Sequence, residues 1–307
     1  AASLLLGGTR SVSADGVGIA VGSSEIVVAN TAAQALAAPE ILLAATDRVA
    51  LLDGSAVQGT GEFTGTPRDI TIGSTAGGVS GEGALLRASS GPQINVARDN
   101  IDATNPARGR LDVESGAVVA GRSVILDATL SNRFGGTLDL DAGGALALGA
   151  NRISAGDTAD VATGLAFSNA QLAALGNPTD LLLRSYSTLD LFGAAVVGNA
   201  GLGSLVIESA GIGGYQNSGQ TARIEAQSVT LRNSRGIAFS NAPALAGGVV
   251  PAPGDGALQV AGQTVSLGDG AVEVKGFNNA TIAAQRELLA AGEGALNTTG
   301  SLHVAAT

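Results

Sequence analysis

The sequence predicts an all-β fold, a parallel β-helix with about 20–24 residues per coil, and three observations lead to this prediction. Short segments of alternating apolar and polar residues recur along the chain, and their apolar positions return at nearly constant spacing. The composition combines 46 glycines and 45% hydrophobic residues with only 3% aromatics and no Cys, Met or Trp. A core made of Ala, Val, Leu and Ile packs well when equivalent positions stack in successive layers, so the composition favours a repeat architecture.

The repeated unit is three to five alternating residues between Gly, Ser, Asn or Asp, the period-2 pattern of a half-buried strand. Examples are GRLDVES at 109–115, GTLDLDAGG at 136–144, STLDLFG at 187–193, GSLVIESAG at 203–211, QSVTLRNS at 227–234, GALQVAG at 256–262 and GSLHVAA at 300–306. Strands this short cannot bury a face alone, so neighbouring units must stack on them.

The spacing of the inner apolar residues predicts the register of stacking. Leu181, Leu205 and Val229 follow one another at equal intervals of one coil each, and the interval from Leu258 to Leu302 is nearly twice as long, as two coils require. We therefore expect the interior to contain the apolar members of these strands, Leu181, Leu183, Leu189, Leu191, Leu205, Ile207, Val229, Leu231, Leu258, Val260, Val265 and Leu267.

The chain is expected to form a single elongated domain over residues 1–307, with a few irregular segments. Residues 168–176 predict a short helix with Ser168 as N-cap, Gln171 at N3 and Gly176 at C′. Residues 31–38 predict a second short helix or a loop, and 241–255, with three of the eight prolines, an irregular loop. Residues 1–60 are apolar but give no clear register.

An antiparallel sandwich is the alternative fold, and two features disfavour it. Its strands normally have five or six residues, longer than most of the segments here. Asp-Gly pairs, which favour hairpin turns, occur only at positions 15–16, 53–54, 255–256 and 269–270. Gly256 and Gly270 are instead expected at sharp corners that require positive φ.

From about residue 105 the sequence resembles the fibre region of filamentous-haemagglutinin-like adhesins, the secreted partners of two-partner secretion systems. The resemblance rests on LLLRSYSTLDLFGAAVVG at 181–198, GSLVIESAGIGGY at 203–215 and ARIEAQSVTLRNSRG at 222–236. It implies a right-handed β-helix, a secreted or cell-surface location, and roles in adhesion, aggregation or biofilm formation. The Asn-Pro-Asn-Gly-type motif of the family's secretion domain does not occur here, so we expect an interior or C-terminal portion of such a protein.

The residues offer little for catalysis. His303 is the only histidine and there is no Cys, so serine–histidine, cysteine–histidine and His-rich zinc sites lack parts. Asp139 and Asp141, and likewise Asp112 and Glu114, alternate on one strand face and form the only candidate acid pairs for a glycosidase. Outward carboxylates keep such strands soluble, so we expect no enzyme, with a carbohydrate-active β-helix (a lyase or glycosidase) as the alternative function.

Ligands are equally few in the sequence. The two Gly-Asp-Gly-Ala copies at 254–257 and 268–271 only partly match calcium-binding repeats, and we expect neither a metal nor a cofactor. A net charge of −10 disfavours nucleic acid, and the most apolar stretch is too interrupted to span a membrane.

We expect a structural and adhesive segment of a secreted bacterial surface fibre, consistent with the lack of cysteine. An autotransporter passenger domain is a further alternative. The expected partners are other copies or coils of the fibre stacked head to tail, an outer-membrane transporter during export, and a surface glycan or protein. The strand at 301–305 remains in repeat register with no cap after it, and residues 3–7 are apolar, so neither end is expected to be a natural boundary.

Overall fold

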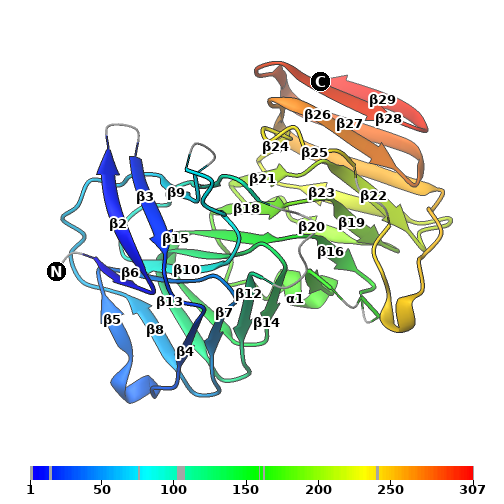
Figure 1. Cartoon of the computed structure of the whole chain (residues 1–307). Coiled ribbons are helices and arrows are strands. Elements are labelled where there is room, and N and C mark those ends of the chain that lie inside the picture. The colour runs from blue at the N-terminus through cyan, green and yellow to red at the C-terminus, as the bar shows by residue number, and fades with distance from the viewer. Residues whose placement is uncertain are drawn as a thin grey trace. The chain divides into compact units, whose positions relative to one another are not determined.

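The computed structural model describes residues 3–13, 16–74, 77–101, 108–158, 160–161, 163–239 and 242–306 (Figure 1). The fold is all-β, as predicted, with strands in most of the chain and one short α-helix among the described residues. Two compact units divide the chain, Ala1–Ala150 and Asn151–Thr307. The expected single elongated domain remains a prediction.

The first unit has three groups of paired strands. In the first group β1 pairs with β6, β6 with β10, β10 with β13, β13 with β15, and β5 and β8 join at β13. These strands are β1 (Leu4–Leu6), β5 (Leu36–Ala38), β6 (Glu40–Ala45), β8 (Ala56–Gly59), β10 (Ala84–Ser89), β13 (Val118–Ala128) and β15 (Thr137–Ala150). The second group, in spatial order, is β11 (Val96–Arg98), β9 (Ile70–Ile72), β3 (Gly16–Val21) and β2 (Gly8–Ser13). The third is β14 (Ser131–Phe134), β12 (Arg110–Val113), β7 (Arg48–Leu51) and β4 (Glu25–Val28).

Antiparallel pairing in the first unit departs from the wholly parallel arrangement expected from the sequence. Strand β10 runs antiparallel to both β6 and β13, and β2 runs antiparallel to β3. Ser13 pairs with Gly16, so only two residues connect β2 to β3, the shortest common hairpin connection. The Asp-Gly pair at 15–16 therefore acts as a hairpin signal, although residue 15 lies outside the described residues.

The second unit has strands in two groups, all paired in parallel. The larger group contains β18 (Asp180–Ser185), β20 (Val196–Gly198), β21 (Ser204–Glu208), β23 (Thr221–Glu225), β24 (Ser228–Arg232), β25 (Gly256–Leu267), β27 (Phe277–Ala290) and β29 (Ser301–Ala306). The other, in spatial order, is β17 (Leu165–Phe167), β16 (Ile153–Gly156), β19 (Leu189–Phe192), β22 (Gly211–Tyr215), β26 (Gly270–Lys275) and β28 (Gly294–Thr298).

The strand register in the second unit confirms the predicted spacing. Leu205 pairs with Leu181 on one side and with Val229 on the other, one equal step away in each direction. Ala280 lies between Leu258 and Leu302 and divides their separation into two equal steps, as expected for two coils. Equivalent apolar side chains therefore stack in layers, as the composition required.

The predicted interior is confirmed for eleven of the twelve residues, which are buried. The exception is Leu267, which is only partly buried. It stacks on Leu231, but its neighbour on the other side is Ala290, whose short side chain is itself exposed. The Ala290 side chain is thus too small to cover Leu267.

The irregular segments lie close to where they were expected. Helix α1 (Asn169–Ala173) begins after Ser168, which forms a capping box with Gln171 as predicted. The helix has its C-cap at Ala174, which makes Leu175 the C′ residue; Gly176, predicted at C′, lies one position further along, with φ 72°. Residues 31–38 form neither a pure helix nor a loop, because a 3₁₀ turn, Ala32–Gln34, leads directly into β5.

The loop at 241–255 is irregular over its described residues, with only a 3₁₀ turn at Ala246–Gly248. It precedes β25 and makes the step from Val229 to its partner Val265 half as long again as the step from Leu205 to Val229. Gly270 has the predicted positive φ, 82°, but Gly256 does not. A Cβ at Gly256 would collide with the carbonyl oxygen of Asn217, so close backbone approach, rather than a corner, requires glycine there.

Candidate functional site

Strands β28 and β29 of the second unit have a partner on one side only within the described residues, as do β17 and β20 elsewhere in the unit. We call β28 and β29 the open edge. Strand β29 pairs with β27, and β28 pairs with β26. In Figure 1 they form the red end of the unit, with the C-terminus beside β29. Each presents a row of backbone N–H and C=O groups that another strand could pair with.

The apolar ladder of the interior continues onto the open edge without being covered. Val304 pairs with Ile282, and Leu302 pairs with Ala280. The exposed fraction is 45% for Val304 and 41% for Leu302, against 3% for Ile282 and 5% for Ala280. Residues that occupy interior positions by register therefore lie at the surface, because no further layer covers them in the described chain.

Nothing on β29 protects it against pairing. Its sequence, SLHVAA, contains no charged residue and no proline, the features that commonly block an exposed edge strand. His303 alternates with Leu302 and Val304 and is exposed on the other face of the strand. The combination of free backbone groups, exposed apolar side chains and absent charge makes β29 a surface suited to strand addition.

The first unit also has a short apolar strand with one described partner. Strand β1 pairs with β6 in parallel, and its last residue, Leu6, is 38% exposed. Both ends were predicted to be open. Strand β29 offers more backbone for pairing than β1, because β29 has six residues and β1 has three.

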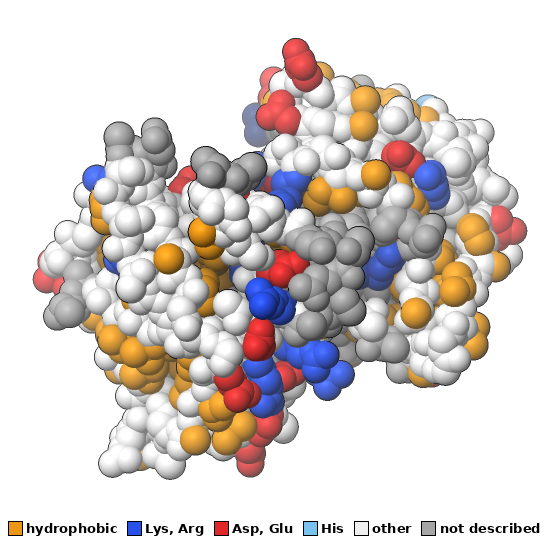
Figure 2. Space-filling view, viewed as in Figure 1, with side chains coloured by type: hydrophobic (Ala, Val, Ile, Leu, Met, Phe, Trp, Pro, Cys, Tyr) orange, Lys and Arg blue, Asp and Glu red, His pale blue; other side chains and the backbone are white. Residues whose placement is uncertain are grey.

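The candidate acid pairs lie on or next to two strands of the first unit, β15 and β12. Asp139 and Asp141 are both exposed on β15. Asp112 accepts a hydrogen bond at 2.7 Å from Nε of Arg48, and Glu114 accepts one at 3.0 Å from the backbone N–H of Asp53. The second pair is therefore engaged in structural contacts, and Figure 2 shows acidic and basic side chains intermixed over β7, β12 and β14.

Each Gly-Asp-Gly-Ala copy leads into a strand, the first into β25 and the second into β26. The Asp269 side chain accepts a hydrogen bond at 3.2 Å from the backbone N–H of Glu293, which ties one layer to the next. Within the described residues no three His, Cys, Asp or Glu side chains are grouped closely enough to hold a metal ion.

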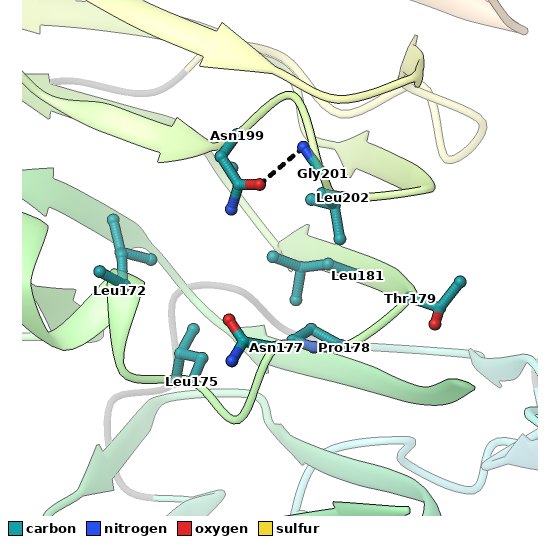
Figure 3. Close-up of a pocket in the computed structure, with 11 residues that line it drawn as sticks. Leu172, Leu175, Asn177, Pro178, Thr179, Leu181, Asn199, Gly201 and Leu202 are labelled. Atoms are coloured by element: carbon teal, nitrogen blue, oxygen red, sulfur yellow. Dashed lines mark hydrogen bonds between the residues drawn. The ribbon is translucent and has the colours of Figure 1, made fainter. Parts of the chain in front are cut away.

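A pocket of about 220 Å³ lies between α1, the segment after it, and the turn that follows β20 (Figure 3). Leucine side chains line it, with the amides of Asn177 and Asn199 beside them. Asn199 Oδ1 accepts a hydrogen bond at 2.8 Å from the backbone N–H of Gly201, which shapes the turn. The lining contains no titratable group, so the pocket offers no general acid or base.

Sequence reasoning missed a ladder of three charges whose central carboxylate is buried. Glu208 lies in register between Arg184 and Arg232 and contacts their guanidinium nitrogens at 3.2 and 3.1 Å. Burial raises the pKa of Glu208, but the charges of both arginines and the Ser234 hydroxyl outweigh it and lower the pKa. The signal was present in the sequence, because these three charges of alternating sign recur at the same interval as the inner leucines.

A second buried cluster surrounds Asp190 on β19. Its carboxylate accepts hydrogen bonds from Arg152 at 2.6 Å and from the Thr188 hydroxyl at 3.1 Å. Burial raises the pKa of Asp190 to about 6 despite the Arg152 charge. Phe192 stacks on Tyr215 with ring centroids 5.4 Å apart, and burial raises the pKa of Tyr215 to about 12. Because the Asp190 side chain is fully buried, we assign this cluster to the fold rather than to chemistry.

Comparisons with known proteins add no relative: no family model, no curated protein and no solved structure matches this chain. Among the described helices, none has the length and apolar character needed to cross a membrane.

Proposed function

We propose that this chain is a β-helical segment of a secreted bacterial surface fibre, which grows by adding parallel layers at the open edge. The observation that carries the proposal is the apolar ladder of the second unit, which reaches Leu302 and Val304 in register and is left uncovered there. The open edge would be covered by a further layer of the same kind. When residues 1–307 are present alone, a second copy of the chain would supply that layer.

Parallel pairing at nearly constant steps from β18 through β21 to β24, and from β25 through β27 to β29, supports the β-helix, because these steps lie within the range of about 20–24 residues expected for one coil. Each step requires the chain to travel around and return beside its starting strand, which a sequence of short strands and glycine turns allows. The right-handed sense, the secreted location and the adhesive or aggregating role are inferred from the resemblance to filamentous-haemagglutinin-like adhesins.

Stacking through the open edge is heterologous, because one end of a copy meets a different surface of the next. Such contacts do not close on themselves and so produce filaments. The short apolar strand β1 is the segment we expect to receive β29 of another copy, since Leu4, Leu5 and Leu6 have a described partner on one side only.

The test is aggregation of bacterial cells that display residues 1–307 on their surface. Cells with the native sequence are expected to clump and to bear filaments visible by electron microscopy. Cells displaying the double variant Leu302→Lys, Val304→Lys should remain dispersed, because a further layer would bury the two lysine charges without partners. Equal dispersal of both strains would contradict the proposal.

A further inference from the structure

A second pocket, of about 200 Å³, lies in the first unit against strands β2, β3 and β9. Val12, Val17 and Ile70 form an aliphatic row across it, since Val12 pairs with Val17 and Val17 with Ile70. Val12 is 65% exposed, whereas the other two are buried. The pocket is smaller than the roughly 300–1,000 Å³ of sites for drug-sized ligands, so it suits a single small ring.

Two arginines from different segments line this pocket, Arg10 on β2 and Arg68 in the segment before β9. The hydrogen bonds described for Arg10 use Nη2, to Ser3 Oγ at 2.8 Å and Glu40 Oε2 at 3.3 Å. Its Nε–H and Nη1–H form no hydrogen bond with the part of the chain that the structure describes, and we take them as the donors for a ligand. Arg68 donates from Nη1 to the carbonyl oxygen of Ser13 at 2.9 Å, and no ion pair is formed by Arg68 with the acidic residues of the described chain.

The carboxylate in the pocket does not neutralise these charges. Glu40 is shared, because Arg87 Nε donates to its Oε1 at 2.8 Å while Arg10 contacts its Oε2. The Arg87 side chain is fully buried and fixes Glu40 in place. The pocket lining thus holds two guanidinium groups, those of Arg10 and Arg68, and one carboxylate that is also paired with Arg87. Positive charge is therefore in excess there, in a chain with a net charge of −10.

An aromatic wall completes the pocket. Phe63 is partly buried and lines the cavity, in a chain that contains only 6 Phe and 2 Tyr. A Cβ at Gly91 would collide with its ring, so the ring packs directly on the glycine backbone. Its position is therefore supported by the backbone beneath it.

We propose that this pocket binds an acidic sugar unit, with the carboxylate held by Arg10 and Arg68 and the apolar face of the ring against Phe63. Guanidinium groups bind carboxylates through charge-assisted, often paired hydrogen bonds. A pocket for one ring selects a uronic acid residue within a surface polysaccharide. This site is separate from the open edge, and its ligand binding does not depend on assembly of the fibre.

The experiment is calorimetric titration of the whole chain with galacturonate, galactose and acetate. Galacturonate should bind in the millimolar range, more weakly as salt is added. Galactose, which lacks the carboxylate, and acetate, which lacks the ring, should each bind at least roughly tenfold more weakly. Arg68→Gln should weaken galacturonate binding by roughly tenfold or more, because a charge-assisted hydrogen bond is lost.

Arg110→Gln is the matched control, because Arg110 is an exposed arginine of the same unit that does not line the pocket. It should bind galacturonate as the native chain does, and melting curves of both variants should match the native one. The proposal is overturned if galacturonate does not bind, if galactose or acetate binds equally well, or if both variants weaken binding alike. Because titration measures ligand binding and cell clumping measures assembly, the two proposals fail independently.

Discussion

Replacement of Leu205 by Asp tests the layered interior at its centre. Leu205 is fully buried and lies in register between Leu181 and Val229. Removing the leucine forfeits about 1.5–3 kcal/mol of burial, and an unpaired charge in a dry core costs several more. The total, about 5 kcal/mol or more, is a large share of the roughly 5–15 kcal/mol that stabilises an ordinary domain.

The matched control is Val206→Asp, one residue further along the same strand. Val206 faces away from the interior and is only partly buried, so its replacement should cost about 1 kcal/mol or less. At about 2–4 °C per kcal/mol, Leu205→Asp should lower the melting temperature by roughly 10–20 °C, or prevent folding of the second unit. Thermal unfolding followed by circular dichroism measures both variants. Equal melting temperatures for the two, or a larger loss for Val206→Asp, would refute the assignment of inner and outer faces.

Three further predictions follow from individual residues. Burial raises the pKa of Asp190 from 3.8 to about 6, so the stability that its protonation contributes is full below about pH 4 and is lost as pH rises through about 6. The melting temperature of the native chain relative to Asp190→Asn should therefore fall between pH 4 and 7, and a constant difference would contradict this. Gly270→Ala should cost about 1–3 kcal/mol in urea unfolding, because of its φ of 82° and the carbonyl oxygen of Asn233 beside it. Gly219→Ala, with similar φ but open space around it, should cost less, and equal losses would count against the close approach. No hydrolysis is expected on a polysaccharide panel; turnover that disappears in Asp139→Asn or Asp141→Asn would restore the enzyme hypothesis.

The second unit was largely predictable because its periodicity is visible in the sequence. Strict alternation identified the inner residues, and the equal steps from Leu181 to Leu205 and from Leu205 to Val229 predicted the register directly. The capping box of α1 followed from Ser168 and Gln171 alone. In this part of the chain the residues that alternate locally are also the ones that pair between layers, so the sequence pattern was enough to predict the strands and their register.

The first unit was less predictable because insertions separate its paired strands. Val49 follows its partner Ile26 after one ordinary coil, but Leu111 follows Val49 after nearly three times that interval, so spacing alone could not align them. The reversal of β10 depends on tertiary pairing, since its sequence ALLRAS contains no sign of direction. The fully buried Arg87 within it was equally hidden, because its partner Glu40 lies 47 residues away.

The two candidate sites also differ in how far the sequence predicts them. The uncovered strand at 301–306 could be predicted from its register, because it repeats the pattern of the strand at 256–262. The pocket of Arg10, Arg68 and Phe63 could not, since three segments with no shared motif meet only in the fold.

Light scattering of residues 1–307 across a concentration series tests the central claim, growth at the open edge, most directly. The account predicts an apparent mass that rises with concentration for the native chain and stays monomeric for Leu302→Lys, Val304→Lys. His303→Lys, on the opposite face of the same strand, should associate more like the native chain than like the double variant. A native chain that remains monomeric at every concentration, or three proteins that behave alike, would contradict it.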